Sequence, residues 1–198
     1  MNEPTPALEP DGQRGDEPWE TSWSERRHYD LVAAMLPNEF YGDVFDPACG
    51  TGELSAMIAA RSEYMLATDL REEAVRQTLV RLAGFNADVF VMDLRDDWPE
   101  RRFDLIVLHE LLPFLDPDDV GGIVRRAVAY LVPDGHLVIG HGRRSASGGA
   151  NGDEISVRAR STPGTRLLAS YQDPDYVIDV LGRDGPPEPD EDEFPLEY

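Results

Sequence analysis

The sequence predicts an α/β fold built on a doubly wound, mostly parallel sheet of seven strands that ends in an antiparallel hairpin. Short apolar segments alternate with segments of helical periodicity, which is the pattern of βαβ units. Residues 103–108 form an almost uninterrupted apolar run, as expected of a central parallel strand. A turn of small residues at 46–52 joins a strand to a helix. With 198 residues, of which 41% are hydrophobic, the chain should form one domain.

The first half of the domain alternates regularly between the two periodicities. The expected strands are short apolar runs, and the expected helices carry apolar side chains at helical spacing and end at Pro37 or before Gly84. These signals place, in order, a helix at 24–36, a strand at 42–46, a helix at 53–61, a strand at 64–68, a helix at 71–82 and a strand at 87–92.

The second half begins with the apolar run and ends with the hairpin. Pro117 suits the first turn of a helix. Two β-rich stretches separated by the turn residues 172–175 predict antiparallel strands. These signals place, in order, a strand at 103–108, a helix at 117–130, a strand at 136–140, a Gly/Ser-rich loop at 142–153, and strands at 166–171 and 176–181.

Acidic residues are concentrated at the two ends of the chain. Residues 1–18 hold five acids and one arginine, and residues 184–198 hold seven acids and no base, so we expect both to be disordered. The domain at 19–183 then keeps a formal charge of −10 out of −21. This charge disfavours nucleic acid and anionic membranes and favours a small or cationic substrate, although a generally acidic proteome would explain it equally well.

All 18 cationic residues are arginines, and Cys49 is the only cysteine. The absence of lysine excludes a P-loop and a Schiff-base enzyme. The lone cysteine excludes an intrachain disulfide or a cysteine-based zinc cluster. No apolar leader or run of transmembrane length is visible, so we expect a cytoplasmic protein.

Asp46, at the end of the first strand, indicates the ligand of the turn. The following small residues, through Gly50 and Gly52, let backbone N–H groups approach a ligand closely. A carboxylate there repels a pyrophosphate, whereas S-adenosylmethionine carries an ammonium and a sulfonium and no phosphate. The turn therefore favours S-adenosylmethionine as cofactor.

Two further aspartates end the second and third strands. Asp69 lies 17 residues beyond Gly52, the spacing of a carboxylate that accepts hydrogen bonds from ribose hydroxyls. Asp93 is placed to accept from the amine of an adenine ring that Leu94 flanks. Each acid alone could equally be the cap of a helix. Together they predict one nucleoside site at the carboxyl edge of the sheet.

With these motifs the sequence resembles the class I S-adenosylmethionine-dependent methyltransferases, a Rossmann-like family, and within them the N-methyltransferases similar to nodulation protein S. The resemblance runs over most of residues 16–182, including the turn, Trp98-Pro99 before the central strand and Pro133-Asp134-Gly135. It implies that the methionine moiety is surrounded by Asp46, Ala48, Gly50 and Gly52, the ribose by Asp69 and Leu70, the adenine by Asp93 and Leu94, and the sulfonium by His109.

The resemblance also implies that the first helix covers the cofactor through Trp23 and through Arg26 or Arg27, one arginine pairing with the cofactor carboxylate. A solvated helix face explains either arginine equally well. Departures from the family pattern lie at Ala48, in place of a glycine, and on the acceptor side at His109. The acceptor of the namesake is therefore not assumed.

Three residues are candidate bases: His109, Glu110 and His141, all expected after strands that end at the cleft. A zinc-protease reading of His109-Glu110-Leu111-Leu112-Pro113 fails for want of the second histidine, and we expect no metal.

We thus expect methyl transfer to nitrogen or oxygen of a small-molecule acceptor, with amines favoured by the acidic charge. One alternative is a cofactor-binding protein without catalysis that acts through a partner. A weaker alternative is an NAD-dependent oxidoreductase, which should have an apolar residue in place of Asp46. The sequence carries no signal of oligomeric state.

Overall fold

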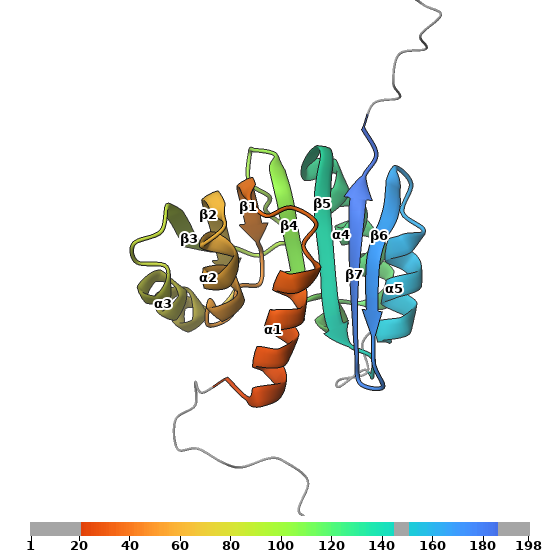
Figure 1. Ribbon diagram of the computed structural model, residues 1–198, viewed down its shortest axis with the longest axis horizontal. Helices are drawn as coiled ribbons and strands as arrows, with labels where there is room; N and C mark the ends of the chain where they lie inside the picture. Colours follow the sequence, from red (N-terminus) through yellow and green to blue (C-terminus); the bar gives the residue numbers. More distant parts are fainter. Residues whose placement is uncertain (1–20, 145–150, 186–198) are drawn as a thin grey trace, which may run out of the picture.

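The computed structural model describes residues 21–144 and 151–185 (Figure 1). Its centre is a seven-stranded sheet with the order β3-β2-β1-β4-β5-β7-β6, in which β7 runs antiparallel to both β5 and β6 and the other pairs are parallel. This confirms the predicted fold class. The strands are β1 (Tyr41–Asp46), β2 (Ser62–Asp69), β3 (Ala87–Val91), β4 (Phe103–His109), β5 (Leu131–Gly142), β6 (Thr165–Gln172) and β7 (Tyr176–Arg183).

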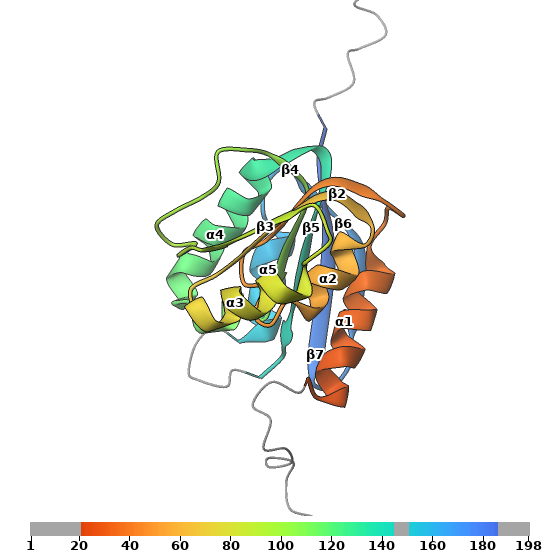
Figure 2. The same cartoon turned by 90° about the vertical axis from the view of Figure 1, so that its left-hand side faces the viewer.

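Helices cover both faces of the sheet, as Figure 2 shows with the sheet seen nearly edge-on. One hydrophobic core joins the first three helices to one face, and a second joins the last two to the other. Neighbouring strand residues alternate between the cores, so Val44 faces the first and Phe45 the second. The helices are α1 (Trp23–Met35), α2 (Glu53–Ala59), α3 (Glu72–Arg81), α4 (Pro117–Tyr130) and α5 (Gly152–Arg160), with a 3₁₀ turn at Leu112–Phe114.

Helix α5 is an element that the sequence analysis missed, because its first residues lie in the Gly/Ser-rich segment expected to be a loop. Asn151 caps it by accepting from the Asp153 N–H at 2.9 Å. Ile155 and Ala159 are the apolar residues that it buries in the second core. Two such residues in nine give a weak helical pattern.

The carboxyl ends of the parallel strands form the lower edge of the sheet in Figure 1. β5 is longer than expected, since it begins at Leu131 rather than at residue 136. The expected disorder at 1–18, and almost all of that at 184–198, falls outside the described residues. Within the described part of the chain, no helix is long and apolar enough to cross a membrane.

Candidate functional site

The turn after β1 is held by a buried network around Asp46. This side chain is 2% exposed, and its Oδ2 accepts a hydrogen bond from the Ser55 hydroxyl at 2.6 Å. Burial raises the pKa of Asp46 to about 6, even though hydrogen bonds from Ser55 and from the Ala48 backbone lower it. The carboxylate therefore lies in surroundings that favour a cationic partner.

The two glycines of the turn have different roles. Both have positive φ, 55° at Gly50 and 78° at Gly52. A Cβ at Gly50 would meet nothing within 4 Å, so this part of the backbone faces open space. A Cβ at Gly52 would lie 2.8 Å from Thr78 Oγ1, so Gly52 packs against α3. It does not line the cavity at the carboxyl edge of the sheet, which Gly50 does line. Gly50 is thus the ligand-facing glycine and Gly52 the structural one.

Asp69 joins the turn to the end of β2. Its Oδ2 accepts from the Gly50 N–H at 3.0 Å, and its Oδ1 accepts from the backbone N–H and the Nε of Arg71 at 2.9 and 3.1 Å. The following Leu70 is 60% exposed and lines the same cavity. The Asp69 carboxylate therefore lies beside the turn.

The end of β3 repeats the arrangement at the end of β2. Asp93 accepts from the backbone N–H and the Nε of Arg95 at 3.0 and 2.9 Å, and this guanidinium lowers the pKa of Asp93 to about 2. Leu94 is buried, and its carbonyl accepts from the Trp98 indole at 2.8 Å. Each Asp-Leu-Arg sequence thus presents a carboxylate at the cavity, with its own arginine two residues later.

These strand ends open into one cavity of about 910 Å³, within the range of small-molecule sites. Its walls come from the turn after β1, the ends of β2, β3 and β4, and the first turns of α1. Of the residues predicted to bind cofactor, the cavity is lined by Asp46, Ala48, Gly50, Asp69, Leu70, Asp93, Leu94 and His109.

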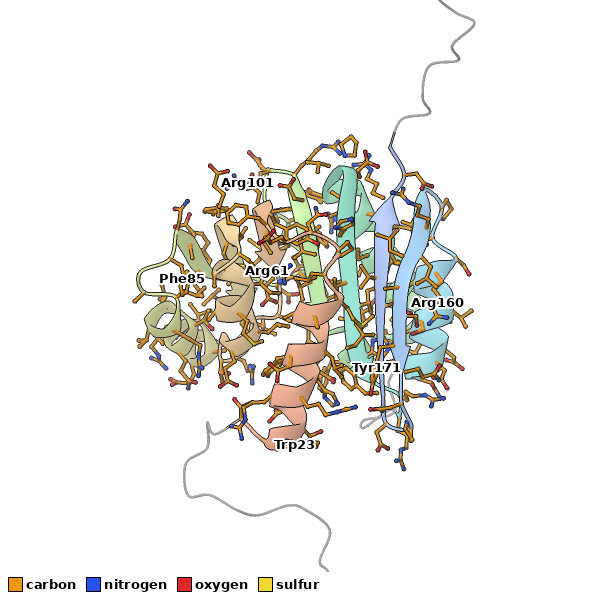
Figure 3. The ribbon with its side chains drawn as sticks, viewed as in Figure 1. Trp23, Arg61, Phe85, Arg101, Arg160 and Tyr171 are labelled. Atoms are coloured by element: carbon orange, nitrogen blue, oxygen red, sulfur yellow. The ribbon has the colours of Figure 1, made fainter. Side chains whose placement is uncertain are left out.

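The three residues expected from the first helix do not line the cavity. Trp23 is 73% exposed at the outer end of α1 (Figure 3). Arg26 donates to the Thr21 carbonyl at 2.8 Å, and Arg27 pairs with Asp173 at 3.0 Å. Helix α1 does cover the site, but with the other side of its first two turns, through Ser22, Ser24, Glu25, His28 and Tyr29.

The wall opposite the turn is aromatic and acidic. Nε2 of His109, at the end of β4, lies 2.7 Å from the Tyr176 hydroxyl at the start of β7. Glu110, which has a positive φ of 50°, follows His109 and lines the cavity. The His28 ring stacks on Tyr176 with 3.6 Å between ring centroids, and the Tyr29 ring lies 5.2 Å from His109. The end of β4, the start of β7 and helix α1 thus meet here.

His141 lies behind this wall and does not line the cavity. Its side chain is 1% exposed, its Nε2 lies 3.0 Å from the Gly152 carbonyl, and its Nδ1 has no partner among the described residues. Burial lowers the pKa of His141. Through its contact with the Gly152 carbonyl, His141 connects β5 to the start of α5, and it does not face the site. His109 and Glu110, the other candidate bases, both line the cavity.

Four residues at this wall, Tyr176, His28, Tyr29 and Glu25, were not predicted as site residues from the sequence. Tyr176 was placed in a strand, but its pairing was not considered. In the sheet Tyr176 pairs with Gly142 of β5, and His109 pairs with Gly140, two residues earlier on the same strand. The signal that could have found it is an aromatic residue at the first position of a strand that follows a tight turn.

Comparisons with known proteins agree with this geometry. Residues 44–135 match a family described as a methyltransferase domain. A candidate methyltransferase from Pseudomonas syringae is 34% identical, with a TM-score of 0.72, and the match covers 82% of this chain and 100% of that one. The N-methyltransferase NodS from Bradyrhizobium japonicum, in complex with S-adenosyl-L-homocysteine, has a TM-score of 0.74 over 88% of this chain and 94% of NodS. At 20% identity, this second likeness shows the fold alone.

A relative with a different substrate class also matches. The ribosomal RNA small subunit methyltransferase C of Erwinia tasmaniensis is 32% identical over 118 residues, which cover 55% of this chain and 34% of that protein. The chain spans 59% of the length of the first curated relatives that it matches.

Proposed function

The chain belongs to the class I S-adenosylmethionine-dependent methyltransferases, and from that premise we propose that it transfers a methyl group to the nitrogen of a small amine. The observation that carries the proposal is the pairing, across one cavity, of the Asp46 turn with an aromatic and acidic wall. The two sides supply the donor site and the acceptor site, respectively.

The residues of the donor side fit S-adenosylmethionine. Asp46 offers a buried carboxylate to the cationic methionine moiety, and Gly50 offers open backbone beside it. Asp69 and Asp93 stand at neighbouring strand ends, where ribose hydroxyls and an adenine amine would donate hydrogen bonds. When bound, this cofactor supplies an electrophilic methyl group on a sulfonium.

The acceptor side favours a cation or an amine over an anion. Glu25 and Glu110 add two carboxylates to the cavity, and Tyr29 adds an aromatic ring. Carboxylates and aromatic faces both attract ammonium groups. The acidic charge of the domain acts in the same direction and disfavours nucleic acid, despite the ribosomal RNA relative.

The contribution of the protein to the reaction is mainly alignment. Holding the acceptor nitrogen in line with the methyl group can supply about 7–11 kcal/mol at the upper end of measured effects. An ammonium must lose a proton before it can attack, and His109 and Glu110 are the candidate bases that line the cavity. Cys49 is no nucleophile, because burial raises its pKa to about 12. The expected cytoplasmic location is part of the same proposal.

The test is turnover of labelled S-adenosylmethionine with a library of small amines, alcohols and short RNAs. We expect label on amines. Label on RNA or alcohols alone would contradict the amine assignment, and binding without any transfer would favour the catalytically silent alternative. Tight binding of NAD in place of S-adenosylmethionine would favour the oxidoreductase.

Calorimetry on Asp69→Asn tests the donor side separately. Loss of hydrogen bonds to a charged acceptor, each about 1.5–3 kcal/mol, should weaken S-adenosylmethionine binding at least tenfold. Asp88→Asn is the matched control, since Asp88 on β3 accepts a hydrogen bond from the Tyr64 hydroxyl on β2 and does not line the cavity. Unchanged affinity in Asp69→Asn would refute the donor site.

A further inference from the structure

The hydrogen bonds around Asp69 use all the acceptor positions of its carboxylate. Two come from backbone N–H groups, those of Gly50 at 3.0 Å and of Arg71 at 2.9 Å. The Arg71 guanidinium adds a second bond to each oxygen, from Nε at 3.1 Å to Oδ1 and from Nη2 at 3.4 Å to Oδ2. A carboxylate offers about four acceptor positions. The described residues thus fill every position of Asp69.

Asp93, at the second Asp-Leu-Arg sequence, keeps one acceptor position open. Its Oδ1 accepts from the backbone N–H and the Nε of Arg95, and its Oδ2 accepts from Nη2 of the same guanidinium at 2.5 Å. Among the described residues, no second group donates to Oδ2. An adenine amine needs one acceptor here, so Arg95 can stay paired with Asp93 when a nucleoside binds.

A ribose beside Asp69 needs the positions that the guanidinium occupies. Its two neighbouring hydroxyls donate two hydrogen bonds, and the carboxylate cannot accept them while Arg71 stays paired. The bonds from the backbone cannot be given up without moving the turn or the start of α3. The two guanidinium bonds are therefore the ones that the ribose hydroxyls can replace, one for one.

One partner of this ion pair is free to move and the other is not. The Arg71 side chain is 68% exposed, whereas that of Asp69 is 8% exposed. Arg71 is the N-cap residue of α3 and makes no cap bond with its side chain, so the guanidinium can turn into solvent without disturbing the helix. Both residues line the cavity. The displaced group is thus the arginine.

We propose that Arg71 competes with the ribose of the cofactor for Asp69, and that its guanidinium must be displaced before the ribose hydroxyls can bind. The proposal rests on the donor side of the proposed function and is independent of the acceptor. Cofactor binds only those molecules in which the ion pair is open, so the closed pair lowers the apparent affinity. Arg95 does not compete in this way, because Asp93 keeps a position free.

Calorimetry with S-adenosyl-L-homocysteine tests the competition by binding alone. This ligand carries the ribose and lacks the sulfonium charge. Arg71→Met removes the guanidinium and keeps an unbranched side chain. We expect binding to tighten about two- to fivefold, as for loss of a partly exposed ion pair. Unchanged or weaker binding would overturn the proposal, because a guanidinium that only orients the carboxylate would help the ligand.

Arg95→Met is the matched control within the same cavity. It removes the same charge from the other Asp-Leu-Arg ion pair. We expect unchanged or weaker binding of S-adenosyl-L-homocysteine, because Asp93 has a free position before the change. Equal tightening in Arg71→Met and Arg95→Met would be a general effect of removing positive charge from the cavity and would overturn the competition at Asp69.

Salt dependence separates an ion pair from a steric effect of the Arg71 side chain. The Debye length falls from about 30 Å at 0.01 M salt to about 3 Å at 1 M, and screening weakens a partly exposed pair. The advantage of Arg71→Met over wild type should therefore shrink across this range. Screening of the other charges is common to both proteins and cancels in the ratio of affinities. A constant ratio would overturn the proposal.

The Asp69→Asn variant distinguishes failure of the competition from failure of the donor site. Unchanged affinity in Asp69→Asn refutes the donor site itself. Weaker binding in Asp69→Asn without tighter binding in Arg71→Met overturns only the competition. The double variant should bind no more tightly than Asp69→Asn alone, because the ion pair is then already lost. The full gain in that background would overturn the competition as well.

Discussion

Replacing Asp46 by asparagine should stabilise the fold and weaken the donor site at the same time. The side chain is 2% exposed, and its charged form is disfavoured by burial and by nearby Asp69. Asparagine has nearly the same shape, and its Oδ1 can still accept from the Ser55 hydroxyl, which lies 2.6 Å from the native carboxylate. The substitution therefore removes mainly the buried charge.

The magnitude follows from the pKa of Asp46 in the two states. It is about 6 in the fold against 3.8 in the reference state, so the folded protein binds this proton more tightly than the unfolded chain. At about 1.36 kcal/mol per pKa unit, the ionised side chain costs the fold about 3 kcal/mol above pH 6. The cost falls as the pH drops from 6 towards 4, where both states are protonated. The asparagine variant avoids this cost, although its buried amide donors cost about 1 kcal/mol.

Urea unfolding of the wild type and Asp46→Asn at pH 5, 6, 7 and 8 checks this difference. We expect the variant to be more stable by about 2 kcal/mol at pH 8 and the gap to close by about pH 5. Other titrating groups are common to both proteins and cancel in the comparison. Parallel pH curves, or a variant that is less stable at pH 8, would refute the electrostatic account of the turn.

Three further outcomes are expected. Calorimetry at different pH values should show that the wild type binds S-adenosylmethionine more weakly as the pH drops below 6, by up to about tenfold per pH unit. The reason is that the cationic ligand binds the ionised form of Asp46. An affinity that does not change with pH would contradict this. Gly52→Ala should lower the stability of the fold by about 2–5 kcal/mol in thermal melts, because it adds both φ strain and overpacking against Thr78. Gly50→Ala adds φ strain alone and should lower it by about 1–2 kcal/mol. Equal losses would contradict the steric argument. Asp179 is 1% exposed and accepts two hydrogen bonds from the Arg160 guanidinium, so Arg160→Met should lower the free energy of unfolding by about 3 kcal/mol. The double variant Arg160→Met with Asp179→Leu should regain most of this stability. If denaturant unfolding shows no recovery, the loss is not a charge effect.

The donor side of the cavity could be predicted because it depends on local rules. Asp46, Asp69 and Asp93 each end a parallel strand, and parallel neighbours end at the same edge of the sheet. Gly50 belongs to a turn whose conformation is determined by its own residue types. No long-range pairing had to be known to bring these residues together.

The acceptor side could not be predicted in this way. The position of Tyr176 depends on the antiparallel register of β7 against β5, and no local pattern specifies that register. The face of α1 that meets the cavity depends on how the helix packs, so Arg27 turns to Asp173 while His28 and Tyr29 turn to the site. Helix α5 is specified by too few apolar residues to stand out from its Gly/Ser-rich surroundings.

The inner position of β7 has a consequence for synthesis of the protein. β7 lies between β5 and β6 in the sheet, although it follows both along the chain. On the ribosome, β5 therefore has an unpaired edge until residues 176–183 emerge, and unpaired apolar edges promote association between nascent chains. Because Tyr176 opens β7, the same late event closes the sheet and completes the acceptor wall. A chain that stops within β7 should aggregate rather than persist as a smaller cofactor-binding protein.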